Sequence, residues 1–130
     1  PCTKPPWGHL TGIDLKTGEH LWQVPLGTSK DLAPFPFTRI KGAPNMGGPM
    51  ATASGLTFIA ATSDYYLRAF STESGKELAK FRLPTGGHAV PMSYTSLEGK
   101  QFVVIAAGGH WAMGSPAGDY LVAFALPETE

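Results

Sequence analysis

Two glycine-rich segments of this 130-residue chain carry side chains that could bind a ligand or move a proton. The segment 108–119, GGHWAMGSPAGD, presents His110 and Trp111, and a histidine can exchange a proton near neutral pH. The segment 42–49, GAPNMGGP, places Asn45 among glycines, where backbone can approach a flat ligand and the amide can donate and accept hydrogen bonds. The simpler alternative is an ordinary surface loop with Trp111 packed as a plug, and the residues alone favour it.

The other residues with chemical potential are weaker candidates. His9, His20 and His88 lack the spacing of metal ligands and have no cluster of carboxylates around them. His88 follows two glycines, and a role in the turn is the expectation there. No segment has the GxGxxG or GxxxxGK pattern of a nucleotide-binding loop. The sequence therefore predicts neither a metal site nor a nucleotide site.

The elements that must position the two loops repeat along the chain. LTGIDLKTGEHLWQVPLG and LRAFSTESGKELAKFRLP each predict a strand, a tight turn and a strand, and LVAFALPE repeats the first strand. SGLTFIAAT and GKQFVVIAAG are nearly continuously apolar, which is typical of strands buried on both faces. No amphipathic helix is predicted. The expected strands are 10–15 and 19–26, then 49–53, 56–62, 65–71 and 76–83, then 89–95, 101–107 and 120–126.

Four-stranded antiparallel units that recur about every 45–60 residues are typical of propeller blades. A β-sandwich or an open meander is the alternative that short strands also permit. The prediction is an all-β chain with about two and a quarter four-stranded antiparallel blades of a larger β-propeller. It divides into a partial blade at 1–27, a full blade at 47–84 and an incomplete blade at 88–126.

A meander also fixes on which side each connection lies. Since successive strands alternate in direction, the long connections 27–48 and 108–119 fall on one face and the tight turns on the other. Asn45 and His110 should therefore emerge opposite Gly18 and Gly75. Because the first and last blades lack strands, their unpaired edges invite partners, and self-association of the chain is expected.

Composition narrows the function classes. The chain is 42% apolar and 15% charged, with 16 glycines and 12 prolines, which suits short strands joined by turns. Ten basic and ten acidic residues cancel without a basic run, so no nucleic-acid partner is expected. The single cysteine cannot form an internal disulfide, and the longest apolar run is too short to span a membrane. Because the chain starts without Met, we expect that it begins mid-protein or was processed.

The first repeat, GIDLKTGEHLW, resembles the tryptophan-docking motif of the quinoprotein dehydrogenases. In that family an eight-bladed propeller binds pyrroloquinoline quinone (PQQ). The motif's Asp, Thr-Gly and Trp are Asp14, Thr17–Gly18 and Trp22. The second repeat departs from the motif, with Ser71 in place of Asp and Ala79 in place of Trp, so a weaker blade-to-blade contact is expected there.

The resemblance covers almost the whole chain, through PCTKPPWGHLTGIDLKTG, NMGGPMATASGLTFIAATSDYYLRAF, LPTGGHAVPMSY and GGHWAMGSPAGDYLVAFALP. These segments are similar to the C-terminal end of the membrane-bound branch, which includes glucose dehydrogenase and quinate/shikimate dehydrogenase. The resemblance implies a periplasmic enzyme, anchored in the inner membrane by a segment outside this chain. Such an enzyme oxidises a sugar or cyclic polyol with PQQ and passes electrons to ubiquinone. Calcium or magnesium would be bound by parts outside the chain.

The same resemblance assigns roles to loop residues but places no catalytic residue or metal ligand within the chain. Asn45, Met46 and Gly47 match the loop that reaches the cofactor. His110 matches a histidine near the substrate, whereas Trp111 replaces a smaller residue and leaves the exact substrate open. The chain alone is therefore expected to be inactive. Two other interpretations are a non-catalytic propeller scaffold for protein–protein interaction, which would lack NMGGP and GGH together with PMSY, and a truncated pseudoenzyme.

Overall fold

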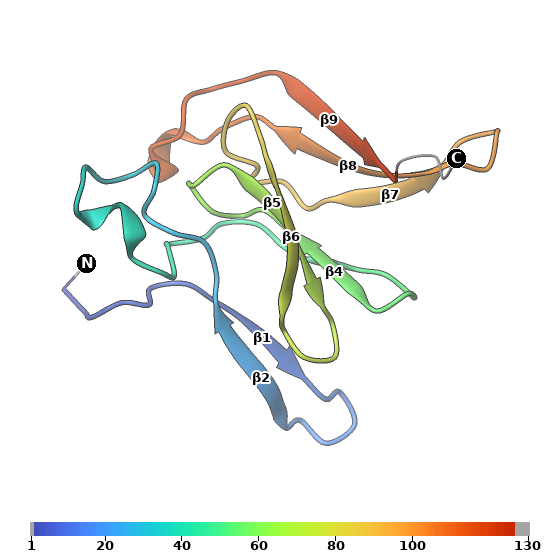
Figure 1. Cartoon of the computed structure of the whole chain (residues 1–130), viewed down its shortest axis with the longest axis horizontal. Helices are drawn as coiled ribbons and strands as arrows, with labels where there is room; N and C mark the ends of the chain where they lie inside the picture. The colour runs from blue at the N-terminus through green and yellow to red at the C-terminus, as the bar shows by residue number, and fades with distance from the viewer. Residues whose placement is uncertain (1, 127–130) are drawn as a thin grey trace.

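Three antiparallel sheets follow one another along the chain in this computed structural model, which describes residues 2–126 (Figure 1). They contain two, four and three strands, as predicted. The ends of the predicted 1–130 span, residue 1 and residues 127–130, lie outside the described residues. The strands are β1 (His9–Ile13) and β2 (His20–Pro25); β3 (Met50–Ala51), β4 (Leu56–Ile59), β5 (Tyr66–Ser71) and β6 (Glu77–Arg82); and β7 (Met92–Thr95), β8 (Gln101–Ala107) and β9 (Tyr120–Ala125).

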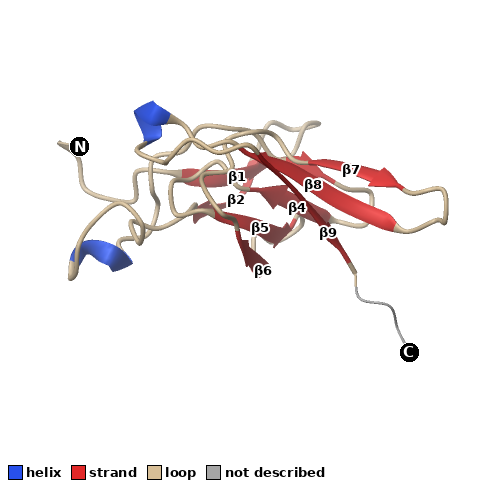
Figure 2. Cartoon of the chain, turned by 90° about the horizontal axis from the view of Figure 1, so that it is seen from above, coloured by secondary structure: helices blue, strands red, loops and turns tan. Residues whose placement is uncertain are grey.

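Helical structure within residues 2–126 is limited to two short 3-10 turns, η1 (Phe37–Arg39) and η2 (Trp111–Met113). Neither is long and apolar enough to cross a membrane. Both lie in the long connections at the left of Figure 1, whereas the hairpin turns of the sheets lie at the opposite end. Seen from above, the two 3-10 turns are well separated from each other across that loop face (Figure 2).

The hairpin turns form because polar side chains and glycines satisfy their backbone. The Asp14 carboxylate accepts hydrogen bonds from the amides of Lys16, at 2.7 Å, and Thr17, at 3.2 Å. Gly18 then takes a φ of +75°, which a glycine adopts without a Cβ penalty. In the next sheet Ser71 replaces Asp14 and accepts one weaker bond, from the Ser74 amide at 3.3 Å. The motif's Asp therefore contributes turn geometry rather than chemistry.

The core lies between neighbouring sheets, which stack face to face. Ile59 and Ile105, from the two most apolar predicted strands, are 3% and 1% exposed, and this confirms the prediction that they are buried. The cluster between the first and second sheets consists of Leu10, Leu26, Ile59, Ala61 and Phe70. The cluster between the second and third sheets consists of Ala60, Leu67, Leu83, Ile105 and Ala107.

Trp22 fastens the first sheet to the second. Its indole N–H donates to the carbonyl of Thr72 at 3.0 Å. A Cβ at either Gly12 or Gly75 would collide with the indole ring, so the ring lies between a strand of its own sheet and the turn of the next. Ala79 stands at the matching position of the second sheet and offers no such contact.

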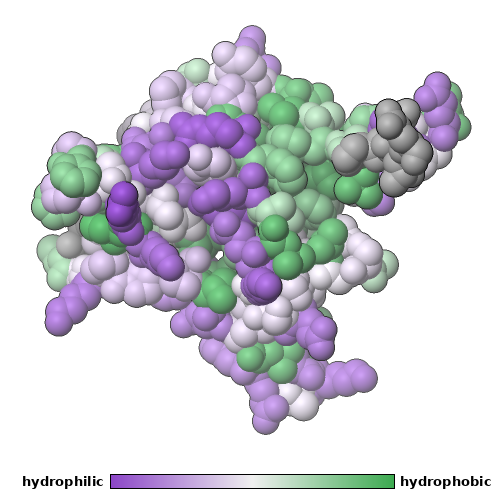
Figure 3. Space-filling model, in the orientation of Figure 1, coloured by the Kyte–Doolittle hydropathy of each residue, from purple (hydrophilic) through white to green (hydrophobic). Residues whose placement is uncertain are grey.

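The junction between the second and third sheets has aromatic rings but no tryptophan. Its aromatic contact joins Phe81 and Phe124, whose ring centroids lie 5.1 Å apart. A mostly apolar groove of about 200 Å³ remains beside them, lined in part by Leu56, Phe58 and Val103. Figure 3 shows apolar side chains gathered over β9, which is an edge strand among residues 2–126 and on which Leu121 is 75% exposed.

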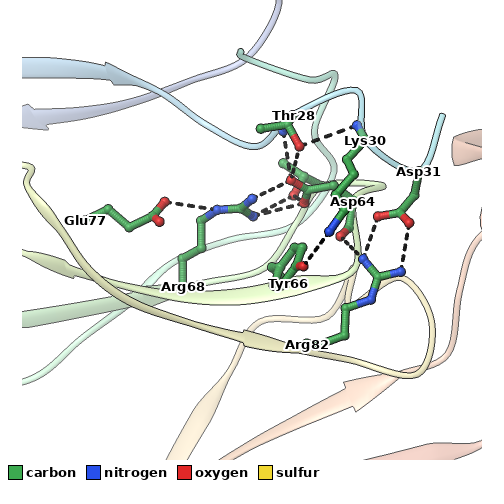
Figure 4. A network of polar contacts seen from close by, with 9 residues as sticks. Thr28, Lys30, Asp31, Asp64, Tyr66, Arg68, Glu77 and Arg82 are labelled. Carbon is green, nitrogen blue, oxygen red and sulfur yellow. Dashed lines mark hydrogen bonds and ion pairs between the residues drawn. The ribbon is translucent and has the colours of Figure 1, made fainter. Parts of the chain in front are cut away.

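A buried polar network ties the segment after β2 to the second sheet (Figure 4). The fully buried Asp64 carboxylate accepts hydrogen bonds from the Thr28 amide, at 2.8 Å, and from the Arg68 guanidinium, at 3.0 Å. Burial alone would raise the pKa of Asp64, but the hydrogen bonds and positive charge of Arg68 hold it below its usual value. A second pair joins Asp31 to Arg82, with N–O distances of 2.6 and 2.8 Å.

Candidate functional site

The two glycine-rich loops meet on one face of the molecule, at His88. His88 Nδ1 lies 3.3 Å from the carbonyl oxygen of Met46 in the first loop. The His88 ring centroid lies 6.0 Å from that of His110 in the second loop. Gly75, by contrast, lies in the turn that packs on Trp22 at the opposite end. The prediction that the two loops share one face is confirmed.

Residues 45–47 are held by backbone contacts and leave their side chains accessible. Asn45 pairs through an isolated antiparallel bridge with Thr62 and is exposed. Met46 donates its amide to the Ala61 carbonyl at 2.8 Å, and its side chain is 43% exposed. Gly47 has a φ of +141°, and a Cβ there would lie 2.9 Å from the carbonyl oxygen of His88. Glycine is therefore required at this position by both conformation and space.

A strained residue stands between the loops, at the end of β4. Ala61 has a φ of +57° although it carries a Cβ, and it is completely buried. Its amide donates to the carbonyl of Gly87 at 2.9 Å, while its carbonyl accepts the Met46 amide. Residues in the left-handed region cost on the order of 1–3 kcal/mol and cluster at functional sites. The chain bends here to bring the 45–47 segment against His88.

The second loop presents His110 and Trp111 differently from each other. His110 is half-buried, and its Nδ1 is a buried ring nitrogen with no hydrogen-bond partner. Trp111 is 89% exposed and stacks on the His110 ring, with centroids 6.2 Å apart and planes 17° apart. The simpler expectation that Trp111 packs as a plug is therefore wrong. Of the two side chains, the exposed indole is the one that a ligand can contact directly, because the unpaired nitrogen of His110 is buried.

The sequence favoured a turn role for His88 over a contribution to the site, and sequence reasoning missed Ser115. His88 Nε2 lies 3.0 Å from the Ser115 hydroxyl oxygen, which also accepts the His110 amide at 2.8 Å. The pair Gly86–Gly87 before His88 was the available signal, because adjacent glycines often mark a close approach of chain segments. Nothing in the sequence pattern marks Ser115.

The chemistry available to the site is binding rather than bond-breaking. Within residues 2–126 no group of three or more His, Cys, Asp or Glu side chains is placed to hold a metal ion. His88 is half-buried, and desolvation lowers its pKa, as does the neighbouring His110. The loops offer accessible backbone and an amide at Asn45 on one side, and the exposed ring of Trp111 beside the half-buried His110 on the other.

Stacked antiparallel sheets in 2-, 4- and 3-stranded order, with loops gathered at one end, define a segment of a β-propeller. Residues 1–103 match the family model of the "PQQ: Glucose/ethanol/alcohol dehydrogenase, beta-propeller domain". The chain belongs to this family.

The sequence relatives agree with this assignment over nearly the whole chain. It is 55% identical to the quinate/shikimate dehydrogenase (quinone) of Acinetobacter baylyi over 97% of its length. It is 48% identical to the quinoprotein glucose dehydrogenase of Escherichia coli over 98%. It is 45% identical to the glycerol dehydrogenase large subunit of Gluconobacter oxydans over 98%. The chain spans 16% of the first two relatives and 18% of the third.

Solved structures share the fold. The quinohemoprotein alcohol dehydrogenase from Comamonas testosteroni superposes with a TM-score of 0.61 and 27% identity, over 83% of this chain and 13% of that one. A europium-containing methanol dehydrogenase gives a TM-score of 0.57 and 25% identity, over 75% of this chain and 14% of that one. The all-β propeller prediction is thereby confirmed.

Proposed function

We propose that this chain is the C-terminal segment of a PQQ-dependent dehydrogenase that oxidises a sugar or a cyclic polyol of the glucose or quinate/shikimate type. Residues 47–84 form one complete blade, and residues 1–27 and 88–126 form parts of its neighbours. The observation that carries the proposal is the identity of 45–55% to glucose, quinate and glycerol dehydrogenases over 97–98% of the chain. The protein is periplasmic and is anchored in the inner membrane through a segment outside this chain, and electrons leave to ubiquinone.

The loop at 45–47 contributes to the cofactor site. A flat quinone needs backbone at close range and polar groups at its rim. Gly47 is exposed and leaves its backbone accessible, and Asn45 presents an exposed amide that can donate and accept. The cofactor supplies the redox chemistry by accepting two electrons from the substrate. The catalytic base and the ligands of calcium or magnesium lie outside this chain.

His110 and Trp111 contribute to substrate binding. The Nδ1 of His110 is buried without a protein partner, so a substrate hydroxyl can pair with it only when the ring turns outward, and the contact would then satisfy a group whose isolation costs about 1–3 kcal/mol. Trp111 offers an exposed apolar ring face, on which the C–H face of a sugar or cyclohexane ring can pack. Both groups position the substrate and neither breaks a bond.

The test is dye reduction by the full-length protein with PQQ and calcium, using glucose, quinate and glycerol as substrates. His110→Asn is expected to raise KM at least about fivefold with a smaller change in kcat, because the contact holds substrate before and during reaction. Asn45→Ala should weaken PQQ binding. His20→Asn, on the exposed face of β2, is the matched control and should leave both constants unchanged. No turnover with any substrate, together with no PQQ binding, would favour the scaffold alternative.

A further inference from the structure

The connection between β6 and β7 is the junction at which the two site loops are joined. The carbonyl of Gly86 accepts the amide of Gly109 at 2.9 Å, and the Thr85 hydroxyl donates to the carbonyl of Pro116 at 2.6 Å. The next carbonyl, that of Gly87, accepts the amide of Ala61 at 2.9 Å. This connection therefore contacts the loop at 108–119 directly and reaches the residue that holds Met46.

His88 completes the junction through a directional run of hydrogen bonds. A carbonyl can only accept, so the contact at 3.3 Å between His88 Nδ1 and the Met46 oxygen requires the hydrogen on Nδ1. In the neutral ring Nε2 is then an acceptor, and the Ser115 hydroxyl donates to it at 3.0 Å. The same hydroxyl oxygen accepts the His110 amide at 2.8 Å. The run joins Met46 to His110 with one donor and one acceptor at every contact.

The glycine at position 86 provides the space for this run. A Cβ at Gly86 would lie 2.5 Å from His88 Nε2 and 2.6 Å from the Ser115 hydroxyl oxygen. Ser115 itself is 4% exposed. The His88–Ser115 contact is thus buried under a backbone that leaves no room for a side chain.

A neutral His88 suits the run better than a charged one. Protonation would put a hydrogen on Nε2 and force the Ser115 hydroxyl toward its remaining acceptor, the His110 carbonyl at 3.4 Å. That distance is long for an O–H donor. The charge that faces His88 from the second loop is that of His110, and the first loop meets it through the Met46 backbone. Desolvation and His110 both oppose the charged ring.

We propose that His88 is a positioning residue, which holds the 45–47 segment and the 110–115 segment in register through the His88–Ser115 contact. The roles of the two segments in cofactor and substrate binding rest on the proposed function, whereas the run itself rests on the contacts described. This contact keeps the 45–47 segment at a fixed distance from His110. A group that sets this spacing affects substrate binding without touching the substrate.

The first test needs no substitution and uses the 130-residue chain. Nitrogen-15 NMR of the histidine rings reports which nitrogen carries the proton. We expect the Nδ1–H tautomer of His88 near neutral pH, with a titration midpoint below the ordinary value of 6.5. An Nε2–H tautomer of His88 would overturn the proposal.

The second test is a double-mutant cycle in the full-length protein. His88→Asn keeps a donor near Met46 but cannot reach Ser115, and Ser115→Ala removes the shared hydroxyl. Each is expected to raise KM about fivefold with kcat changed less than about twofold, and the double variant should be no worse than either. Ser115→Thr restores the hydroxyl and should recover KM, and His20→Asn is again the control.

The outcomes separate this inference from the proposed function. If the two effects on KM multiply, the residues act independently and the run is not the link between the loops. In the chain itself, Ser115→Ala must shift the amide resonance of His110, and an unmoved resonance would overturn the proposal even if the variant binds substrate normally. A full-length protein without dehydrogenase activity would refute the proposed function, while the tautomer and the His110 resonance still decide the role of His88.

Discussion

Removal of the indole of Trp22 should weaken the contact between the first and second sheets and destabilise the fold. Trp→Ala substitutions in a full core cost about 3–5 kcal/mol. Trp22 is only half-buried, so about 2 kcal/mol is expected from packing against Gly12 and Gly75, and about 1 kcal/mol from its bond to Thr72. Trp22→Ala should therefore lower the free energy of unfolding by about 3 kcal/mol. Trp22→Phe keeps a ring without the N–H and should lose about half of that.

The assay is urea unfolding of the 130-residue chain followed by far-ultraviolet circular dichroism, at matched concentrations because association would shift the midpoint. Trp111→Ala is the control, since it deletes the same side chain at a position that is 89% exposed. It should change the free energy of unfolding by less than about 0.5 kcal/mol. Equal losses for Trp22→Ala and Trp111→Ala would refute the assignment of Trp22 as the contact between the sheets. Equal losses for Trp22→Ala and Trp22→Phe would show that the hydrogen bond, and not packing, is decisive.

Four further outcomes are expected. Asp64→Asn should lower the free energy of unfolding by about 3 kcal/mol in urea, because the buried Arg68 then keeps only the partly exposed Glu77, at 3.2 Å, as a charged partner, whereas the exposed Asp119→Asn should have little effect. Since the folded pKa of Asp64 lies below 3.8, its contribution is present above that pH and is lost as pH falls through the depressed pKa, so Asp64→Asn should flatten the acid limb of the stability curve. The folded pKa of His88 is also lowered, so its contribution should decline as pH falls below about 6.5, and a stability curve unaltered by His88→Asn in that range would contradict this. The unpaired edges of β1 and β9 should make the isolated chain self-associate, and a strict monomer by light scattering at high concentration would argue against it.

The fold was predictable because its signals are local. Asp14 and Gly18 fix a turn by short-range hydrogen bonds and a positive φ, and alternate strand directions then decide the face of every loop. The buried pair Asp64–Arg68 was not predictable, because charged residues beside a strand are usually solvated and their burial depends on Thr28 arriving from another sheet.

The candidate site was predictable only in part for the same physical reason. Glycine-rich loops at one end indicated Asn45 and His110, but the resemblance supplied their roles. The contact between His88 and Ser115 joins residues 27 positions apart, and no periodicity encodes such a pairing. The exposure of Trp111 could not be inferred either, because an indole in a loop can equally well be packed.

The contacts between the first and second sheets differ from those between the second and third sheets. The second set includes residues that also hold the site loops in place. The first and second sheets are joined near the hairpin turns by Trp22, and near the long loops by the hydrogen bonds of Asp64. The junction between the second and third sheets has Ala79 in place of a tryptophan. Its polar contacts are those of residues 85–88 with the second loop and the hydrogen bond from the Ser63 hydroxyl to the Met113 carbonyl at 2.7 Å. Contacts that align the proposed binding loops therefore also hold the third sheet.

One experiment tests whether the isolated chain, in which the two site loops already meet, has dehydrogenase activity. The 130-residue chain with PQQ, calcium, glucose or quinate, and an artificial electron acceptor should show no turnover above the free-cofactor background. The loops meet, but the proposed catalytic base lies outside this chain, and a base must lie within about 3 Å of the hydroxyl proton. A cofactor held from two blades alone also remains open to water on its other sides. Turnover above background would show that the missing blades are dispensable and that the division of roles between this chain and the rest of the enzyme is wrong.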